Sequence, residues 1–331
     1  MISITSFFKV LPGIALVTAI AIPAYYLGLS VPLIGGPVFA ILLGMAAAFW
    51  QRSSIYDTGI TFSAKKILQA SIVLLGFEMN LHHVWEVGSQ SIAIMAFTLS
   101  AAFMAAYIMG QYLKIDGNIR ILIGVGTAIC GGSAIAATAP VISATHKEVA
   151  YSISTIFLFN VAAVFIFPAT GHLLGMSDIG FGMWAGTAIN DTSSVVAAGY
   201  TYSHAAGNFA TIVKLTRTLM IIPITLGLSL FMAKKNNAHS EFNFIKIFPW
   251  FVLGFLLTSL VSTNELLNPA ITNLLAQTGK FFIVIAMAAI GLNTHFKQLI
   301  SNGINPIILG LSCWLAVALV SIALQHYLAV W

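Results

Sequence analysis

Long runs of apolar residues, most about 20 residues long, alternate with short polar segments along the whole chain. The runs are continuous and do not alternate apolar with polar residues, so they predict membrane-spanning helices rather than barrel strands. The segments between them are rich in Gly, Asn, Pro and Ser, as turns are. We expect eleven spans, at approximately 10–29, 37–50, 64–81, 91–112, 119–143, 150–169, 181–200, 211–233, 244–261, 273–292 and 304–330.

The composition supports an all-α polytopic membrane protein. Hydrophobic residues make up 59% of the 331 residues and charged residues 7%, with a mean hydropathy of +0.97. A soluble domain carries about 25% charged residues, which excludes a soluble enzyme, a disordered protein and a disulfide scaffold. The sequence lacks His-Glu-x-x-His, a phosphate-binding glycine loop and Gly-x-Ser-x-Gly. We therefore expect no enzymatic activity, no cofactor and no metal.

The net charge of +5 is explained by membrane orientation and requires no nucleic acid partner. With a cytoplasmic N-terminus, one face collects ten basic residues: Lys9, Arg52, Lys65, Lys66, Lys114, Arg120, Lys234, Lys235, Lys246 and Lys297. The opposite half carries Lys147 and Lys280, and also Lys214 and Arg217 if those are surface residues. We therefore expect a plasma (inner) membrane protein with its N-terminus in the cytoplasm and its C-terminus outside.

Eleven spans can be divided into one extra helix and two units of five. The extra helix is 10–29, which we expect to be retained rather than cleaved, and the units are 34–170 and 180–331. An odd number of helices inverts the second unit relative to the first, as in inverted-repeat transporters. Sequence support is mixed, because the tetrapeptide GTAI occurs at 126–129 and again at 186–189, in spans expected to be parallel. This repetition is either a shared local device at a site or chance.

Span 119–143 contains the segment GVGTAICGGSA at 124–134, with four glycines and three hydrogen-bonding side chains. Glycine pairs are places where a helix loses its regular backbone hydrogen bonding. A break would expose free carbonyls and free N–H groups, which bind cations and anions respectively. Ser133 would then be the N-cap of a second helix over 134–143. The alternative is that the small residues only allow close helix packing.

Span 181–200 carries the polar run Asn190-Asp191-Thr192-Ser193-Ser194. A charged side chain at mid-membrane costs roughly 2.5–3.5 kcal/mol or more, so Asp191 is expected to be protonated, paired with a cation or bound to an ion. A structural ion pair, or a span boundary that lies half a helix away, would explain it without a function. Asn160 in span 150–169 is expected to form an interhelical hydrogen bond.

Lys214 and Arg217 share one face of span 211–233, because they are three residues apart. Both fall within the first two turns of that span, where long basic side chains can snorkel to the membrane surface. Two other roles stay open, an anion clamp with Asp191 as counter-charge and a structural pair with Asp191.

These residues make the sequence recognisable. It resembles the YeiH-type sulfate exporter family of bacterial inner-membrane proteins. The resemblance covers nearly the whole chain, and it rests on GVGTAICGGSA at 124–134, VVAAG at 195–199, KLTR at 214–217, FPWF at 248–251 and AMAAIGL at 286–292. It implies export of a small oxyanion such as sulfate or sulfite. It also implies kinship with the bile-acid and arsenite transporter superfamily, in which spans 119–143 and 273–292 would be the crossing broken helices.

The sequence departs from the family pattern at one position that matters. The pattern of many family members is a His-Glu pair followed shortly by Ala-Gln. At the corresponding place this chain has Asn190-Asp191-Thr192-Ser193-Ser194. The acid is shortened and the imidazole is absent. If that imidazole carries protons in the relatives, coupling here is expected to differ, with sodium as the candidate ion.

These observations predict a secondary active transporter of a small anion. The predicted substrate-binding residues are Thr127, Cys130, Gly131, Gly132, Ser133, Asn190, Thr192, Ser193, Lys214 and Arg217. Asp191, Asn190 and Thr192 are predicted to hold the coupling ion, sodium or a proton. The expected partners are a small anionic solute and membrane lipids, and a homodimer stays open. The alternatives are sodium-driven uptake of an organic anion and a non-transporting intramembrane sensor or structural subunit.

Overall fold

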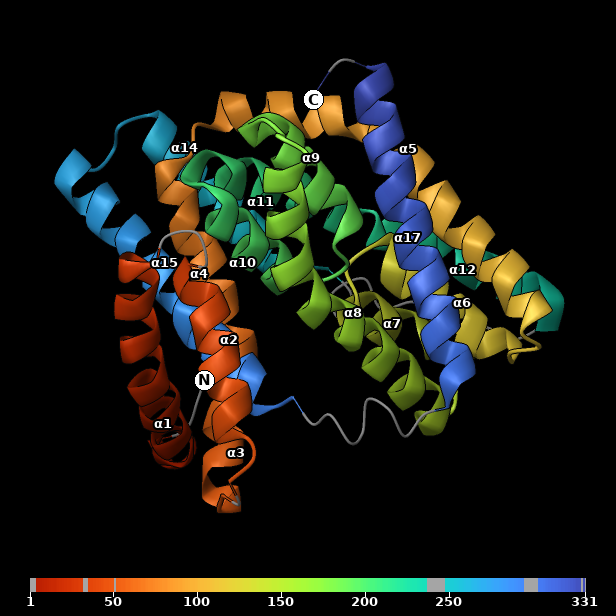
Figure 1. Cartoon of the computed structure of the whole chain (residues 1–331), viewed down its shortest axis with the longest axis horizontal. Helices are drawn as coiled ribbons and strands as arrows, with labels where there is room; N and C mark the ends of the chain where they lie inside the picture. Colours follow the sequence, from red (N-terminus) through yellow and green to blue (C-terminus); the bar gives the residue numbers. More distant parts are fainter. Residues whose placement is uncertain are drawn as a thin grey trace. The chain divides into compact units, whose positions relative to one another are not determined.

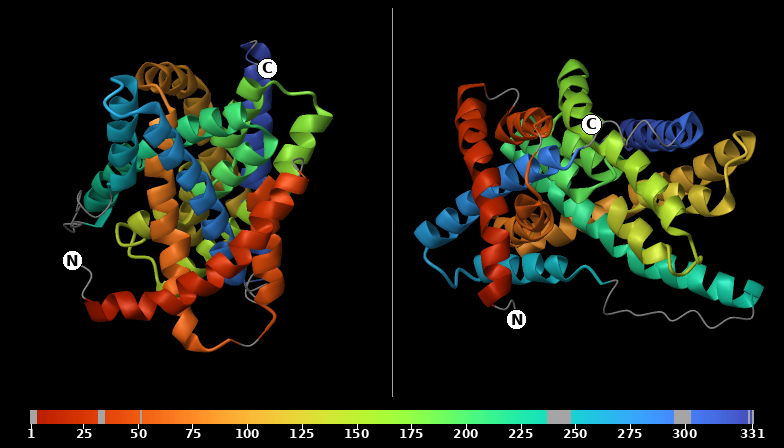
Figure 2. Two further views of the ribbon diagram at one scale, coloured as in Figure 1. Left: turned by 90° about the vertical axis from the view of Figure 1, so that its left-hand side faces the viewer. Right: turned by 90° about the horizontal axis from the view of Figure 1, so that it is seen from below.

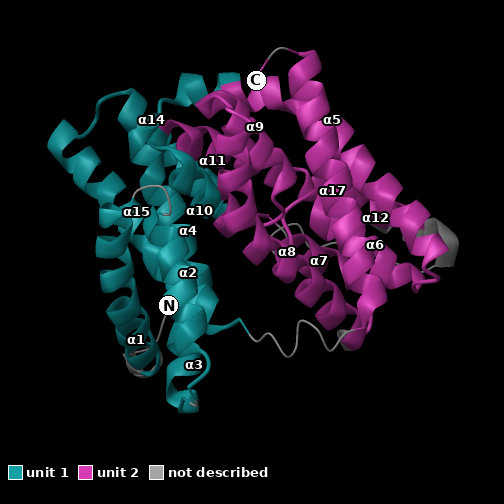
Figure 3. Cartoon of the chain, viewed as in Figure 1, with its two compact units in different colours: residues 1–86, 196–204, 250–295 teal, residues 87–195, 205–249, 296–331 magenta. Residues whose placement is uncertain are grey.

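The computed structural model describes residues 4–31, 35–50, 52–236, 248–294, 303–328 and 330, and within these ranges it contains helices and turns but no strand. The prediction of an all-α polytopic membrane protein is confirmed. Contacts divide the chain into two compact units, coloured separately in Figure 3. Unit 1 comprises 1–86, 196–204 and 250–295, and unit 2 comprises 87–195, 205–249 and 296–331. The predicted basic loop residues Lys246 and Lys297 lie outside the described residues.

Within the described ranges, seven helices are long and apolar enough to cross a membrane: Lys9–Ser30, Ser54–Glu78, Leu81–Tyr112, Lys147–Leu173, His204–Leu228, Pro269–Leu292 and Ile304–Tyr327. Two shorter apolar helices, Gly35–Ala47 and Trp250–Thr263, correspond to spans 37–50 and 244–261. The remaining predicted spans, 119–143 and 181–200, are each divided into two short helices. Each predicted span therefore has a helical counterpart. The number that cross a membrane and the division at 34–170 and 180–331 stay predictions, because packing units do not test internal symmetry.

Unit 1 is built from α1 (Ile4–Ser30), α2 (Gly35–Ala47), α3 (Asp57–Phe62), α4 (Leu68–Leu75), α14 (Trp250–Thr263) and α15 (Pro269–Leu292). In Figure 1, α2 and α15 lie against one another. Their backbones touch at Gly44 and Gly291, where an added Cβ would overlap the carbonyl oxygens of Ala288 and Ile41. Small residues of this kind let helices approach closely where lipid provides no hydrophobic drive for association.

The helix α15 runs unbroken from Pro269 to Leu292, so the expectation of a broken helix in span 273–292 is wrong. Its two glycines are used for packing rather than for a break. Gly291 faces α2, and an added Cβ on Gly279 would lie 3.0 Å from Leu74 Cβ in α4. The segment between them is rich in good helix formers, including Ala286 to Ala289.

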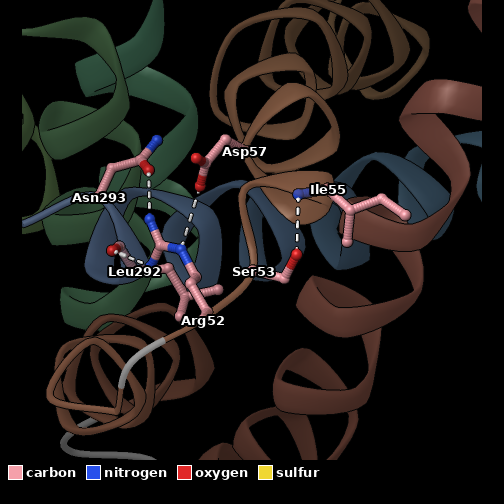
Figure 4. Close-up of polar contacts among 6 residues, drawn as sticks. All are labelled: Arg52, Ser53, Ile55, Asp57, Leu292 and Asn293. Atoms are coloured by element: carbon pink, nitrogen blue, oxygen red, sulfur yellow. Dashed lines mark hydrogen bonds and ion pairs between the residues drawn. The ribbon is translucent and has the colours of Figure 1, made fainter.

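Arg52 holds the C-terminal end of α15 (Figure 4). Its guanidinium donates to Leu292 O at 2.7 Å, to Asn293 Oδ1 at 3.4 Å and to Asp57 Oδ1 at 3.2 Å. The last carbonyls of a helix carry partial negative charge and lack partners within the helix. Arg52 thus connects the segment after α2 to the end of α15 within unit 1.

Unit 2 contains α6 (Gly117–Ala128), α7 (Gly132–Thr138), α8 (His146–Leu173), α9 (Asp178–Ala188), α12 (Ile221–Asn236), α17 (Ile304–Tyr327) and most of α5 (Leu81–Tyr112) and α11 (His204–Leu219). The helix α10 (Thr192–Tyr202) begins in this unit. A capping box of Thr145 and Glu148 starts α8. The helix α17 packs on α6, α8 and α9, and Trp184 Nε1 of α9 donates to Ala318 O of α17 at 3.1 Å. Figure 2 shows α11 and α12 following one another along one direction.

The contact between α2 and α15 generates the first prediction. Gly291→Ala places a methyl group against the backbone of α2, so we expect the free energy of unfolding in detergent to fall by about 1–3 kcal/mol. Gly227→Ala is the control, since no atom lies within 4 Å of its added Cβ. Equal unfolding midpoints for the two variants would contradict the tight packing.

Candidate functional site

Two helices of unit 2 break at the repeated tetrapeptide. The first GTAI ends α6 at Ala128, and the second ends α9 at Ala188, so that Ile129 and Ile189 are the first residues of the two breaks. Figure 1 labels the helices on either side of each break, α6 and α7 for the first and α9 and α10 for the second. Gly131, at φ +67° and ψ −129°, allows the turn into α7, in a conformation that side-chain-bearing residues avoid. The predicted break in span 119–143 is confirmed. The repeated sequence is therefore a shared local device for ending a helix.

Lys214 and Arg217 occupy the middle of the apolar helix His204–Leu228, and both are fully buried. The prediction that they lie in the first two turns of their span is wrong, because the helix begins at His204 and not near 211. This also removes the snorkelling alternative. The first turns of the helix contain polar residues that lower the local hydropathy, so the hydropathy pattern placed the start of the helix too late.

The two cations bind the carbonyl ends of both broken helices. Lys214 Nζ donates to Ile129 O at 2.7 Å and to Ile189 O at 3.0 Å. Arg217 donates through Nε to Ala128 O at 2.6 Å, through Nη1 to Ile189 O at 3.3 Å and through Nη2 to Thr127 O. A helix C-terminus carries roughly half a negative charge and several unpartnered carbonyls, so a buried cation is a favourable partner.

Asp191 forms an ion pair with neither cation, so the predicted structural pair with Lys214 and Arg217 is wrong. The carboxylate Oδ2 instead accepts hydrogen bonds from the backbone N–H of Ser193 at 3.0 Å and from its hydroxyl. These groups belong to the first turn of α10, where helix N–H groups favour an anion. The cations are held by the helix C-termini, and the carboxylate is held by a helix N-terminus.

The two breaks lie next to each other. Asn160 of α8 accepts a hydrogen bond from the backbone N–H of Asp191 at 3.1 Å, which confirms its predicted interhelical role. A Cβ added to Gly131 would lie 3.5 Å from Asn160 Nδ2 and 3.5 Å from Asp191 Cβ. Asn160 therefore joins α8 to both breaks.

Two buried polar side chains at the breaks have no hydrogen-bond partner among the described residues. They are Asn190, with both its Oδ1 and Nδ2 atoms, and Thr127, with its Oγ1 atom. Asn190 is 1% exposed and Thr127 is fully buried. A buried polar group without a partner costs about 1–3 kcal/mol, so such groups are commonly partners of water or a ligand.

The other predicted site residues lie around these breaks. Cys130 is a buried free thiol, and Thr192 and Ser193 are buried in the first turn of α10. Ser133 is not the N-cap of α7, because that helix begins at Gly132 and Gly131 is the cap. Ser133 is exposed, and no atom lies within 4 Å of a Cβ added to Gly132.

Sequence reasoning missed the Ile129 and Ile189 carbonyls as partners of the two cations, and it missed the break at 189–191. Isoleucine side chains give no hint of a polar role, and the second break contains no glycine. The repeated tetrapeptide was the available signal, since it marks the same position in both helices.

The fold and this arrangement define a multi-pass membrane protein with two discontinuous helices, whose ends meet around buried charges. Residues 12–310 match the family described as Conserved hypothetical protein 698, and the chain belongs to this family. This confirms the resemblance to the YeiH-type family.

Similar proteins are named UPF0324 membrane proteins. One from Streptococcus pyogenes serotype M6 is 51% identical over 97% of this chain and 98% of its own length. One from Streptococcus agalactiae serotype V is 48% identical, covering 97% and 98%, and one from Fusobacterium nucleatum is 46% identical, covering 96% and 98%. No solved structure matches the chain.

The carbonyl contacts of the cations generate the second prediction. Lys214→Met keeps the length of the side chain but leaves the buried Ile129 carbonyl without its donor and Ile189 O with Arg217 Nη1 alone. The free energy of unfolding should therefore fall by about 1–3 kcal/mol. Lys147→Met, at an exposed position, is the control. The free energies of unfolding of both variants are measured in mixed detergent micelles. A Lys214→Met protein as stable as the control would contradict the structural role.

Proposed function

We propose that the protein is a secondary active transporter that exports a small anion, of the sulfate or sulfite kind, across the bacterial plasma membrane. The observation that carries the proposal is the arrangement of the two breaks: their carbonyl ends are bound by Lys214 and Arg217, while an unpartnered Asn190 amide precedes the N-terminus of α10. Polar groups concentrated at broken helices in apolar surroundings are typical of solute pathways. The cytoplasmic N-terminus and the external C-terminus remain part of this proposal.

The charges of this region favour an anion when Asp191 is neutralised. The two cations contribute two positive charges. Two helix C-termini offset roughly one of them, and the N-termini of α7 and α10 return roughly one. Ionised Asp191 leaves about one positive charge, and a proton or a sodium ion on Asp191 raises this to about two, so a small anion would bind more strongly. This links anion binding to a coupling ion.

In this proposal the two cations act as positioning residues. Lys214 and Arg217 orient the helix ends and supply positive potential. The anion binds the Asn190 amide and Thr192, and it binds Ser193 in exchange for the hydrogen bonds of Ser193 to Asp191. Thr127, Cys130, Gly131, Gly132 and Ser133 form the side of the site contributed by α6 and α7. Asp191, with Asn190 and Thr192, holds the proton or sodium ion.

The membrane potential supports the proposed direction of transport. A divalent oxyanion that leaves with one proton or sodium ion still carries one negative charge outward. An inside-negative potential favours that movement by about 2.3 kcal/mol per charge and 100 mV. Export is therefore electrically favourable even with a coupled cation.

Removing the unpartnered amide is the third prediction. Asn190→Ala should reduce sulfite or sulfate flux in proteoliposomes at least about tenfold, because it removes the donor and acceptor assigned to the anion. Asn264→Ala is the matched control, since that exposed side chain, one residue after α14, donates to Leu260 O in the last turn of that helix. Normal flux in Asn190→Ala would remove Asn190 from the site. Purified wild-type protein with no flux of any small anion would instead favour a sensor or structural subunit.

Neutralising the carboxylate is the fourth prediction. Asp191→Asn should keep anion exchange but lose its dependence on the pH or sodium gradient, because the amide cannot take up the coupling ion. Asp116→Asn, at an exposed position before α6, is the control. Unchanged coupling in Asp191→Asn would refute the assignment. Inward flux of an organic anion that follows a reversed sodium gradient would support sodium-driven uptake instead of export.

A further inference from the structure

A second feature of unit 2 lies away from the helix breaks. The helices α5, α6 and α12 enclose a groove of about 430 Å³. Five of its lining residues are largely apolar: Phe103, Ala106, Tyr107, Ile121 and Leu228. None of these residues belongs to the proposed transport site. The volume of the groove lies within the range of about 300–1,000 Å³ that is typical of ligand pockets.

Arg120 lines the same groove, together with Gln111 and Gly117. It is the fourth residue of α6, so it lies within one turn of the loop that joins α5 to α6. Its aliphatic stem crosses Gly110 of α5, where an added Cβ would overlap the Cδ and Cγ atoms of Arg120. The absence of a side chain at Gly110 thus seats the arginine against the groove.

The guanidinium of Arg120 lacks a partner where it is buried. Its Nε atom is buried and makes no hydrogen bond to any described residue. An arginine stays charged in proteins, so an unpartnered N–H on it is costly to bury. A phosphate oxygen is a strong partner for such a group, because guanidinium and phosphate form charge-assisted, often bidentate hydrogen bonds.

An apolar groove with a cation near the membrane surface matches the two ends of a phospholipid. The neighbouring Tyr107 and Tyr112 are 62% and 80% exposed, as is typical of aromatic residues at the lipid–water boundary. The loop between α5 and α6 is on the face expected to be cytoplasmic, where anionic lipids are enriched. We propose that this groove binds an anionic phospholipid, with its phosphate on Arg120 and an acyl chain along Phe103, Ile121 and Leu228.

The test measures lipid retention by the delipidated full-length protein in detergent, using native mass spectrometry. The probes are dioleoyl phosphatidylglycerol and dioleoyl phosphatidylcholine, which have identical acyl chains. We expect about tenfold preferential retention of the phosphatidylglycerol by the wild type, and Arg120→Gln should abolish the preference. Lys114→Gln is the matched control, because it removes the same charge from an exposed residue outside the groove.

A second variant keeps the charge and fills the space beside it. A Cβ on Gly117 would lie 3.7 Å from Arg120 Nη2, an ordinary contact distance. Gly117→Trp should therefore block the phosphate position and abolish the preference, whereas Gly117→Ala should retain it. If Arg120→Gln fails to fold, the comparison of Gly117→Trp with Gly117→Ala tests whether the groove binds the lipid phosphate.

Three results would overturn the proposal. If Arg120→Gln and Lys114→Gln lost the preference for phosphatidylglycerol equally, the preference would come from diffuse surface electrostatics rather than from a site. Equal retention of the two lipids by the wild type would show that the groove does not discriminate between their headgroups. A delipidated dimer that Gly117→Trp dissociates would show that a second copy of the chain, and not a lipid, covers the groove.

Discussion

Backbone carbonyls that end a helix inside an apolar environment need partners that water cannot supply, and this requirement organises unit 2. Two helices end at Ile129 and Ile189, and the fully buried Lys214 and Arg217 bind both ends. A lysine and an arginine without these carbonyls would be too costly to bury at that depth. The carbonyl ends without the cations would be equally unsatisfied. Each feature therefore depends on the other.

The rest of the site follows from this mutual satisfaction. Because the cations are occupied by helix C-termini, Asp191 is bound by the first turn of α10 instead. Asn160 joins α8 to the second break, close to Gly131 in the first. Asn190 and Thr127 keep polar atoms without a described partner, and the proposed function assigns these groups to the transported solute. A preformed arrangement with a few open polar groups is the usual design of a small-molecule site.

Predictions from sequence were accurate where the cause is local. The apolar runs matched helices, and the glycines at 131–132 marked the first break, because hydropathy and backbone freedom act on neighbouring residues. Predictions failed where the cause is a distant contact. The start of α11 at His204 was missed because its first turns contain polar residues, although Ala206, Phe209 and Ala210 in them are buried. The break expected in span 273–292 is absent because Gly291 packs on α2.

The amino-acid sequence by itself determined the class of protein, the approximate helices, the family and the short set of charged residues at membrane depth. Hydropathy, glycine content and motif order suffice for these, because each is read along the chain. Only the tertiary structure decided what the charges bind. Lys214 meets Ile129 O and Arg217 meets Ala128 O across more than 80 residues of sequence, through backbone atoms that every residue type possesses. No side-chain pattern encodes such partners, so their identity depends on how α6, α9 and α11 pack.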